Sequence, residues 1–194
     1  MKTLNLSDIN YINSDKFTLV KNNNRFILKY NNDNFVIDSE TRFDKCNIYS
    51  RDNNKIKINF NNNNNSHKYF INVMRNLYDI VSELIISLDE IEATNIKDPI
   101  YSQESQKMLF TKFNSKTQIK NLKTDEIINI SDLCDKVFDI YPIFSSPNIN
   151  VSGDNIYINF TFYIIFIDSL ELDVKEVNEV TLDYNKIRKI MNKK

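Results

Sequence analysis

The chain has 194 residues and a formal net charge of −1, with 41% hydrophobic and 12% aromatic residues, so it is long and apolar enough for one domain with a packed core. Its single glycine excludes the GxGxxG, Walker and G-x-S-x-G loops, which need several glycines for close backbone approach. Two cysteines and one histidine leave no zinc-ligand cluster, and neither an enzyme activity, a metal nor a cofactor is expected.

Residues 1–60 are expected to form β-strands separated by asparagine-rich turns. The strand-like runs combine β-branched and aromatic residues, and they cover 17–20, 25–30, 35–37 and 55–60. Asparagine, which occurs 31 times, tolerates the left-handed backbone conformation of tight turns. It can therefore take the place of the missing glycines in this part of the chain.

The most regular pattern lies between Lys68 and Glu92. Apolar residues recur there at intervals of three and four positions, namely at Phe70, Val73, Met74, Leu77, Val81, Leu84, Ile85, Leu88 and Ile91. This spacing predicts a long amphipathic helix with one buried face. Ser66 is its expected N-cap, and His67 is expected to belong to the helix start.

The middle of the chain is basic. A weaker helix is predicted from Ser102 to Phe113, then a short strand at 127–130 and a helical turn at 131–136. Residues 107–124 contain no acid and five lysines: Lys107, Lys112, Lys116, Lys120 and Lys123. This segment is the clearest local concentration of positive charge.

The last third is predicted to be β-structure followed by a charged tail. One strand is expected at 137–144. A second, long strand is expected at 156–167, with its second half buried on both faces. Gly153 lies in the turn before the long strand, where a hairpin needs a positive φ. Residues 168–183 hold six acids, and 184–194 carry a net charge of +5 and are expected to be a short helix.

Cys46 and Cys134 are expected to be free, reduced thiols. The N-terminal residues lack the apolar stretch of a signal peptide, so the protein is not expected to be secreted. No apolar run reaches about 18 residues, and no membrane span is expected.

Two stretches of the chain, 34–83 and 138–168, resemble the single-stranded-DNA-binding proteins of poxviruses and other large DNA viruses. The first has the family's order of extended strand, polar-basic loop, lysine-flanked strand (KIKINF) and amphipathic helix. The second, FDIYPIFSSPNINVSGDNIYINFTFYIIFID, is similar to its late hairpin, in which a proline-containing strand precedes a turn and a long alternating strand. Together they cover about 40% of the chain.

The resemblance implies an α+β fold in which a long amphipathic helix packs against an OB-like antiparallel β-barrel. Residues 1–170 would form this domain, and 171–194 would be an acidic then basic tail. The implied function is non-enzymatic, sequence-tolerant coating of single strands during viral DNA replication, recombination or repair, in the host cytoplasm or nucleus. Implied partners are single-stranded DNA or RNA, further copies along the strand and replication proteins. Related proteins often end in an acidic tail that recruits partners, whereas here basic residues follow the acids.

Binding of single strands without sequence preference needs cations along the phosphates and aromatic faces for the bases, at about 1–3 kcal/mol per stacked base. The main candidate residues lie where lysines and phenylalanines interleave: Lys107, Phe110, Lys112, Phe113, Lys116, Lys120 and Lys123. The alternative is a solvated loop anchored by its phenylalanines, and at least one of these two rings is expected in the core.

Three further sets extend the predicted interface. The first is Tyr49, Arg51, Lys55 and Lys57, where both lysines are expected on one strand face with Ile56 and Ile58 on the other. The second is Arg25, Lys29 and Tyr30, and the third is Tyr157 alone. The alternative for the lysine-bearing strands is an ordinary exposed strand face, and the alternative for Tyr157 is a buried ring with a bonded hydroxyl.

A competing hypothesis belongs to another class of function. The chain would be a viral scaffold or host-interaction protein that dimerises through the long helix. Lysines that converge with aromatic rings in one groove favour nucleic-acid binding, and scattered lysines favour the scaffold.

Overall fold

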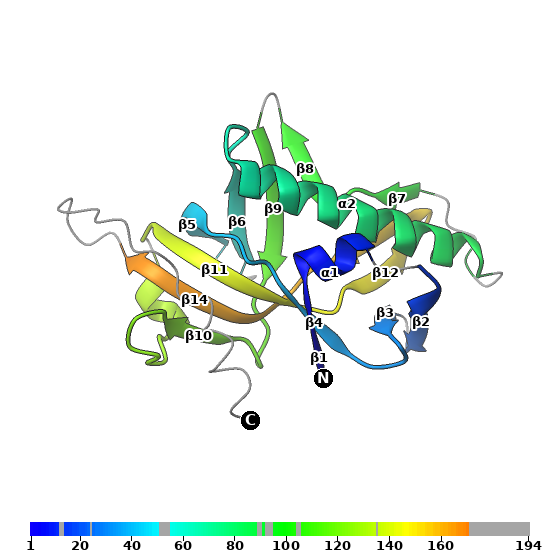
Figure 1. Cartoon of the computed structure of the whole chain (residues 1–194), viewed down its shortest axis with the longest axis horizontal. Coiled ribbons are helices and arrows are strands. Elements are labelled where there is room, and N and C mark those ends of the chain that lie inside the picture. Colours follow the sequence, from blue (N-terminus) through cyan, green and yellow to red (C-terminus); the bar gives the residue numbers. More distant parts are fainter. Residues whose placement is uncertain are drawn as a thin grey trace.

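Most of the described chain consists of β-strands, in which buried and exposed side chains alternate, and one long helix carries an apolar stripe (Figure 1). The computed structural model describes residues 1–11, 14–23, 25–50, 55–88, 91, 95–103, 106–134 and 136–170. Within these residues the strands make two sheets, and side chains of the helix and of both sheets share one hydrophobic core.

The larger sheet has the order β1 (Lys2–Asn5), β4 (Phe35–Asp38), β11 (Phe138–Ser145), β5 (Phe43–Ser50), β6 (Lys55–Phe60), β9 (Gln106–Lys112) and β8 (Ile100–Gln103). β14 (Phe162–Leu170) pairs with one edge of β11, while β4 and β5 share its other edge. β10 (Gln118–Asn121) pairs in parallel with β14. The sheet is curled, because β6, β9 and β8 turn away from the long β11–β14 pair (Figure 1).

The smaller sheet has the order β2 (Phe17–Asn22), β3 (Arg25–Tyr30), β12 (Asn148–Ser152), β13 (Asn155–Asn159) and β7 (Asn95–Lys97). Between β11 and β14, which belong to the larger sheet, the chain contributes β12 and β13 to the smaller one. Gly153, between β12 and β13, has φ +55°, which confirms the positive φ predicted for the only glycine. Asn23, Asn31 and Asn32 have positive φ as well, so asparagine does supply left-handed turn positions.

Helix α2 (Asn65–Ile86) buries the predicted apolar face against both sheets. The Phe70 ring lies 5.1 Å from that of Phe43 on β5 and 5.8 Å from those of Phe60 on β6 and Phe144 on β11. About two turns further along the helix, the Tyr78 hydroxyl donates to the carbonyl of Ile96 on β7, at 3.1 Å. The helix therefore ties the two sheets together.

The ends of α2 differ from the prediction. Asn64, not Ser66, is the N-cap, and its side-chain oxygen accepts hydrogen bonds from the backbone nitrogens of Ser66 and His67. The helix ends at Ile86, with Ser87 as C-cap, six residues before the expected end at Glu92. A shorter helix, α1 (Leu6–Tyr11), was not predicted; it packs near α2.

The helix predicted from Ser102 to Phe113 is wrong. Within that range, 102–103 belong to β8 and 106–112 to β9; the two strands are antiparallel, and β9 also pairs with β6. Spacing alone did not distinguish the two structures, since a short apolar cluster fits either period. The expected strand at 127–130 is reduced to a bridge between Ile127 and Lys120, followed by a 3₁₀ turn, Ile130–Leu133.

The single strand predicted for 156–167 is also wrong, because the chain changes sheets at Phe160 and Thr161. The backbone carbonyl of Phe160 accepts from the Thr111 hydroxyl at 2.8 Å, and that of Thr161 accepts from the Ser145 backbone nitrogen at 2.8 Å. The expectation that the second half is buried on both faces is confirmed, since residues 164–167 are all buried.

The structure confirms the α+β class with a long helix packed on β-sheets. Closure into an OB-like barrel stays a prediction. The predicted tail, 171–194, lies outside the described residues. Both cysteines are free, as expected. No helix of the described chain is long and apolar enough to cross a membrane.

Candidate nucleic-acid interface

Strands β6, β9 and β8 present lysines and aromatic rings on one shared face. Lys55 on β6 is paired with Lys112 on β9, and Lys57 with Phe110. Tyr101 on β8 joins them, with its ring centroid 6.5 Å from that of Phe110 in an edge-on arrangement. We call these five residues the lysine–aromatic face.

The opposite face of the same strands explains this placement. Ile56 and Ile58 on β6, and Leu109 and Thr111 on β9, are buried in the interior. Because side chains alternate along a strand, burying these residues turns their neighbours outward. The predicted separation of Lys55 and Lys57 from the two isoleucines is therefore confirmed.

The charge of the lysine–aromatic face is not balanced within its strands. β6, β8 and β9 contain no aspartate or glutamate. Lys55 and Lys112 are opposed directly, and like charges in such a position destabilise a sheet. The rings of Tyr101 and Phe110 are 56% and 36% exposed, although rings of this size are usually buried. An arrangement that is unfavourable for folding alone suits a ligand that is both anionic and flat.

The outer face of the smaller sheet carries a second row of polar and aromatic side chains. Across β3, β12, β13 and β7, the residues in register are Arg25, Asn150, Tyr157 and Lys97. Lys29 lies further along β3, opposite Thr18. None of the five strands of this sheet contains an acid. We call the four residues in register the second row.

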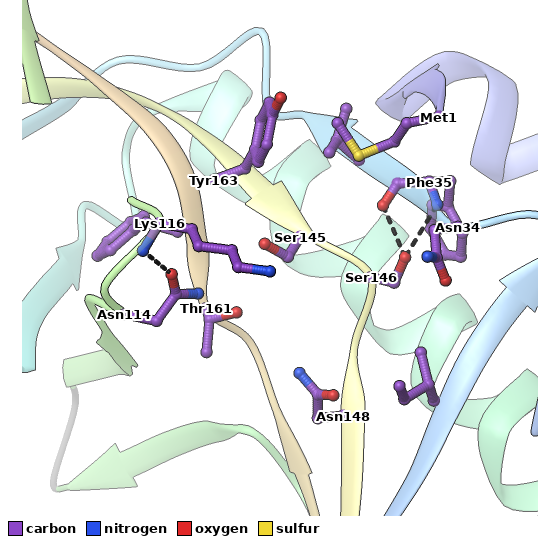
Figure 2. Close-up of a pocket in the computed structure, with 13 residues that line it drawn as sticks. Met1, Asn34, Phe35, Asn114, Lys116, Ser145, Ser146, Asn148, Thr161 and Tyr163 are labelled. Carbon is purple, nitrogen blue, oxygen red and sulfur yellow. Dashed lines mark hydrogen bonds between the residues drawn. The ribbon is translucent and has the colours of Figure 1, made fainter. Parts of the chain in front are cut away.

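A pocket of about 290 Å³ opens where the two sheets meet (Figure 2). Its polar lining comes mainly from Asn34, Lys116, Ser145, Asn148 and Thr161. Figure 2 shows the Lys116 side chain extending across the pocket toward Ser145. The described residues that line it include no acid.

Two solved structures are similar to this chain. One is the single-stranded DNA-binding protein from bacteriophage Enc34, with 10% identity and a TM-score of 0.48 over 89% of this chain and 99% of that one. The other is a C-terminal truncation of the same phage protein, with 8% identity and a TM-score of 0.48 over 85% of this chain and 100% of that one. No protein-family model matches the chain, and no curated protein does.

Two of the predicted base-stacking residues are buried. Tyr30 is 5% exposed; its ring packs 5.4 Å from that of Phe17, beneath the ammonium group of Lys2. Phe113 is 9% exposed and packs 5.5 Å from Phe162. Neither ring can stack on a base in this structure, which corrects both assignments. Of the two phenylalanines in the basic segment, one is in the core, as expected, and Phe110 is the accessible one.

The basic segment does not form one surface. Lys107 lies opposite Phe60, on the inward face of β9 and away from Lys112. Lys120 donates to Asp125 at 2.9 Å, so a carboxylate already balances its charge. Lys123 lies in the turn after β10, and Lys116 lies at the pocket. Arg51 and the side chain of Tyr49 lie outside the described residues.

Three residues of these surfaces were not predicted from the sequence. Tyr101 joins the lysine–aromatic face only because β8 pairs with β9. Asn150 and Lys97 join the second row because β12 and β7 flank β13. Lys97 stands two residues before Pro99, in a segment that interrupts the helical pattern and gave no sign of a parallel strand.

Proposed function

We propose that this protein binds single-stranded DNA with little sequence preference, through the lysine–aromatic face. The observation that carries the proposal is the convergence of Lys55, Lys57 and Lys112 with Phe110 and Tyr101 on three adjacent strands without an acid. Residues nearly 60 positions apart in the sequence meet there, as a binding surface requires.

The two residue types supply two kinds of binding energy. Lysines that neutralise phosphates release counterions, so affinity falls as salt concentration rises. Exposed rings stack on bases at about 1–3 kcal/mol per base, and every base has a face on which to stack. The net charge of −1 means that this attraction is local to the face, since it does not come from the charge of the whole molecule.

A preference for single strands follows from the rings. Bases inside a duplex already stack on one another, so Phe110 and Tyr101 have no free base face to contact there. A duplex would be held by the lysines alone and would bind more weakly. The same surface would accept RNA, since none of its contacts depends on a 2′-hydroxyl group.

In the competing scaffold hypothesis, the chain would dimerise through α2, but the apolar face of that helix is already occupied. Phe70, Val73, Leu77 and Val81 of α2 are buried within the chain's own core. A dimer formed through this apolar stripe would require the domain to open.

The biological part of the proposal rests on the resemblance of 34–83 and 138–168 to viral single-strand-binding proteins. In that role the protein would coat strands exposed during replication, recombination or repair of a large DNA virus, at replication sites in the host cytoplasm or in the nucleus.

The test is fluorescence anisotropy with a labelled strand of about 30 nucleotides, single or duplex, at low and physiological salt. A double variant, Lys57→Gln with Lys112→Gln, is compared with Lys68→Gln and Arg75→Gln, two exposed cations on α2. We expect tighter binding of the single strand, and a log–log salt slope that the face variant lowers by about 1.4. Equal affinities for the two double variants would contradict the proposal.

A further inference from the structure

The pocket of Figure 2 lies between the lysine–aromatic face and the outer face of the smaller sheet. Ile27 and Asn148 line it, and they form a register pair on β3 and β12, two positions along the strands from the pair of Arg25 and Asn150 and on the same face. On the other side, Thr161 lines it and forms a bridge with Lys112 at the end of β9. The pocket therefore lies beside residues of both surfaces, so a strand that runs directly from one to the other meets it.

The loop that carries Lys116 is fixed at the pocket rim. The Asn114 side-chain oxygen accepts from the Lys116 backbone nitrogen at 2.7 Å. The Thr117 hydroxyl accepts from the Asn114 backbone nitrogen at 2.9 Å and donates to the Phe162 carbonyl on β14 at 2.7 Å. These bonds hold the backbone of the loop against β14, so Lys116 is positioned over the pocket (Figure 2).

The opposite wall is also firm. The Ser146 hydroxyl donates to the Phe35 carbonyl at 2.6 Å and accepts from the Phe35 backbone nitrogen at 3.0 Å. This pair closes the junction between β11 and β4 behind the pocket. The Ser146 hydroxyl is thereby engaged in hydrogen bonds to the backbone. The polar groups that remain to face a ligand are those of Ser145, Thr161, Asn34 and Asn148.

The lining has the chemistry of a nucleotide site. The ammonium group of Lys116 suits a phosphate, since no acid is among the described residues of the lining. Each asparagine amide offers both a donor and an acceptor, so it can pair with the edge of any base. The buried rings of Phe35 and Phe162 supply an apolar floor. The volume of about 290 Å³ is near the lower end for small-ligand sites and suits one nucleotide.

We infer that this pocket holds one nucleotide of the bound strand, with its phosphate on Lys116. The strand then continues from the lysine–aromatic face, through the pocket, to the second row of Arg25, Asn150, Tyr157 and Lys97. This inference rests on the proposed function and adds a path across both sheets to it.

The test uses two pocket variants of the full chain. Lys116→Gln removes the charge, and Asn34→Trp fills the pocket from an exposed position. Lys68→Gln and Asn72→Trp make the same changes on the exposed side of α2. With a labelled dT strand of about 20 nucleotides, we expect each pocket variant to bind roughly three- to ten-fold more weakly than its control. Lys116→Gln should also lower the salt slope by about 0.7, whereas Asn34→Trp should leave it unchanged. Thermal melting checks that all four variants fold.

The possible results separate the two proposals. If the wild-type protein binds the strand in a salt-dependent manner, but the pocket variants match their controls, the pocket is not on the path and the inference is overturned while the function stands. If the wild-type protein binds no single strand at low salt, both fall together. As a direct probe, thymidine 5′-monophosphate should shift the backbone amide NMR signals of Lys116 and Asn148 saturably, and unchanged signals would also overturn the inference.

Discussion

Lys57 and Phe110 stand directly opposite each other on β6 and β9, so an ammonium group and an exposed ring leave the same face of one sheet. Side chains in such a pair are about 5 Å apart at Cβ. That spacing lets one nucleotide contact both, with its phosphate near the lysine and its base near the ring.

Removing the ring of Phe110 should weaken binding without unfolding the protein. We expect Phe110→Ala to lower affinity for single-stranded DNA about 5- to 150-fold, the equivalent of about 1–3 kcal/mol for one stacked base. Tyr69→Ala is the matched control, since Tyr69 is a similarly exposed ring on α2. Anisotropy titrations of both variants, with urea unfolding to check stability, make the comparison. The same affinity for the two variants would remove Phe110 from the interface.

His67 is predicted to be important for stability and not for binding. The ring is buried; Nδ1 accepts from the Asn61 backbone nitrogen at 2.9 Å, which leaves Nε2 to donate to the Arg42 carbonyl at 2.8 Å. His67→Leu leaves both backbone groups without these partners, and we expect a loss of about 2–4 kcal/mol in the free energy of unfolding. Urea titration measures it against Ser66→Ala, at an exposed neighbouring position. A loss no larger than that of Ser66→Ala would show that the two bonds contribute little.

Asp139 should stabilise the start of β5. Its carboxylate accepts from the Arg42 side chain and, at 2.9 Å, from the backbone nitrogen of Lys45, which has φ +54°. Burial by itself lowers the pKa of Arg42, but the hydrogen bond with Asp139 and the charges of Asp139, Asp168 and Asp44 raise it above its ordinary value. Arg42 therefore stays charged at any pH used for the protein.

We expect Asp139→Asn to cost about 1–2 kcal/mol of unfolding free energy, a figure reduced because Arg42 is partly exposed. Asp44→Asn should cost less than about 0.5 kcal/mol, because the Asp44 side chain is 52% exposed against 16% for Asp139. Urea unfolding of the two variants tests the difference, and equal losses would contradict it.

The two thiols should differ in reactivity. Burial, and to a lesser extent the charges of Asp139 and Asp44, raise the pKa of Cys46 well above its ordinary value, so this thiol stays protonated at pH 8. Cys134 is only half-buried. We expect iodoacetamide at pH 8 to label Cys134 in the native protein and to label Cys46 only after urea is added. Mass spectrometry of the peptides reads out both sites. Rapid native labelling of Cys46 would mean that the strands around it open readily.

Much of the local structure could be predicted because it depends on short-range pattern. The spacing from Phe70 to Ile85 predicts a helix with one buried face wherever that helix packs. Alternation predicts that Lys55 and Lys57 share a face, and Gly153 supplies the positive φ of its turn. Even so, Asn64 was missed as the cap of α2, since several asparagines in a row can each serve in that position.

The residues of the candidate interface could not be identified from the sequence pattern alone. From the sequence, Lys107, Lys112, Lys116, Lys120 and Lys123 look like one basic segment. In the structure, Lys107 lies on the inner face of β9 and Lys120 forms an ion pair with Asp125. Lys112 lies on the lysine–aromatic face. The local spacing in 102–113 fits a helix as well as a strand. The pairing of β9 with β6 decides in favour of a strand.

The α+β composition, the long helix, the turns and the side-chain partition of most strands follow from the amino-acid pattern, since each depends on residues a few positions apart. Strand pairing was needed to bring Lys57 to Phe110, to add Tyr101 to them, and to place Lys116 at the pocket between the sheets. Lys57 and Phe110 are tens of positions apart, and even Tyr101 and Phe110, which are close in the sequence, meet only because β8 pairs with β9. These contacts depend on which strands pair with one another. The strand pairing depends in turn on the free energy of packing the whole core.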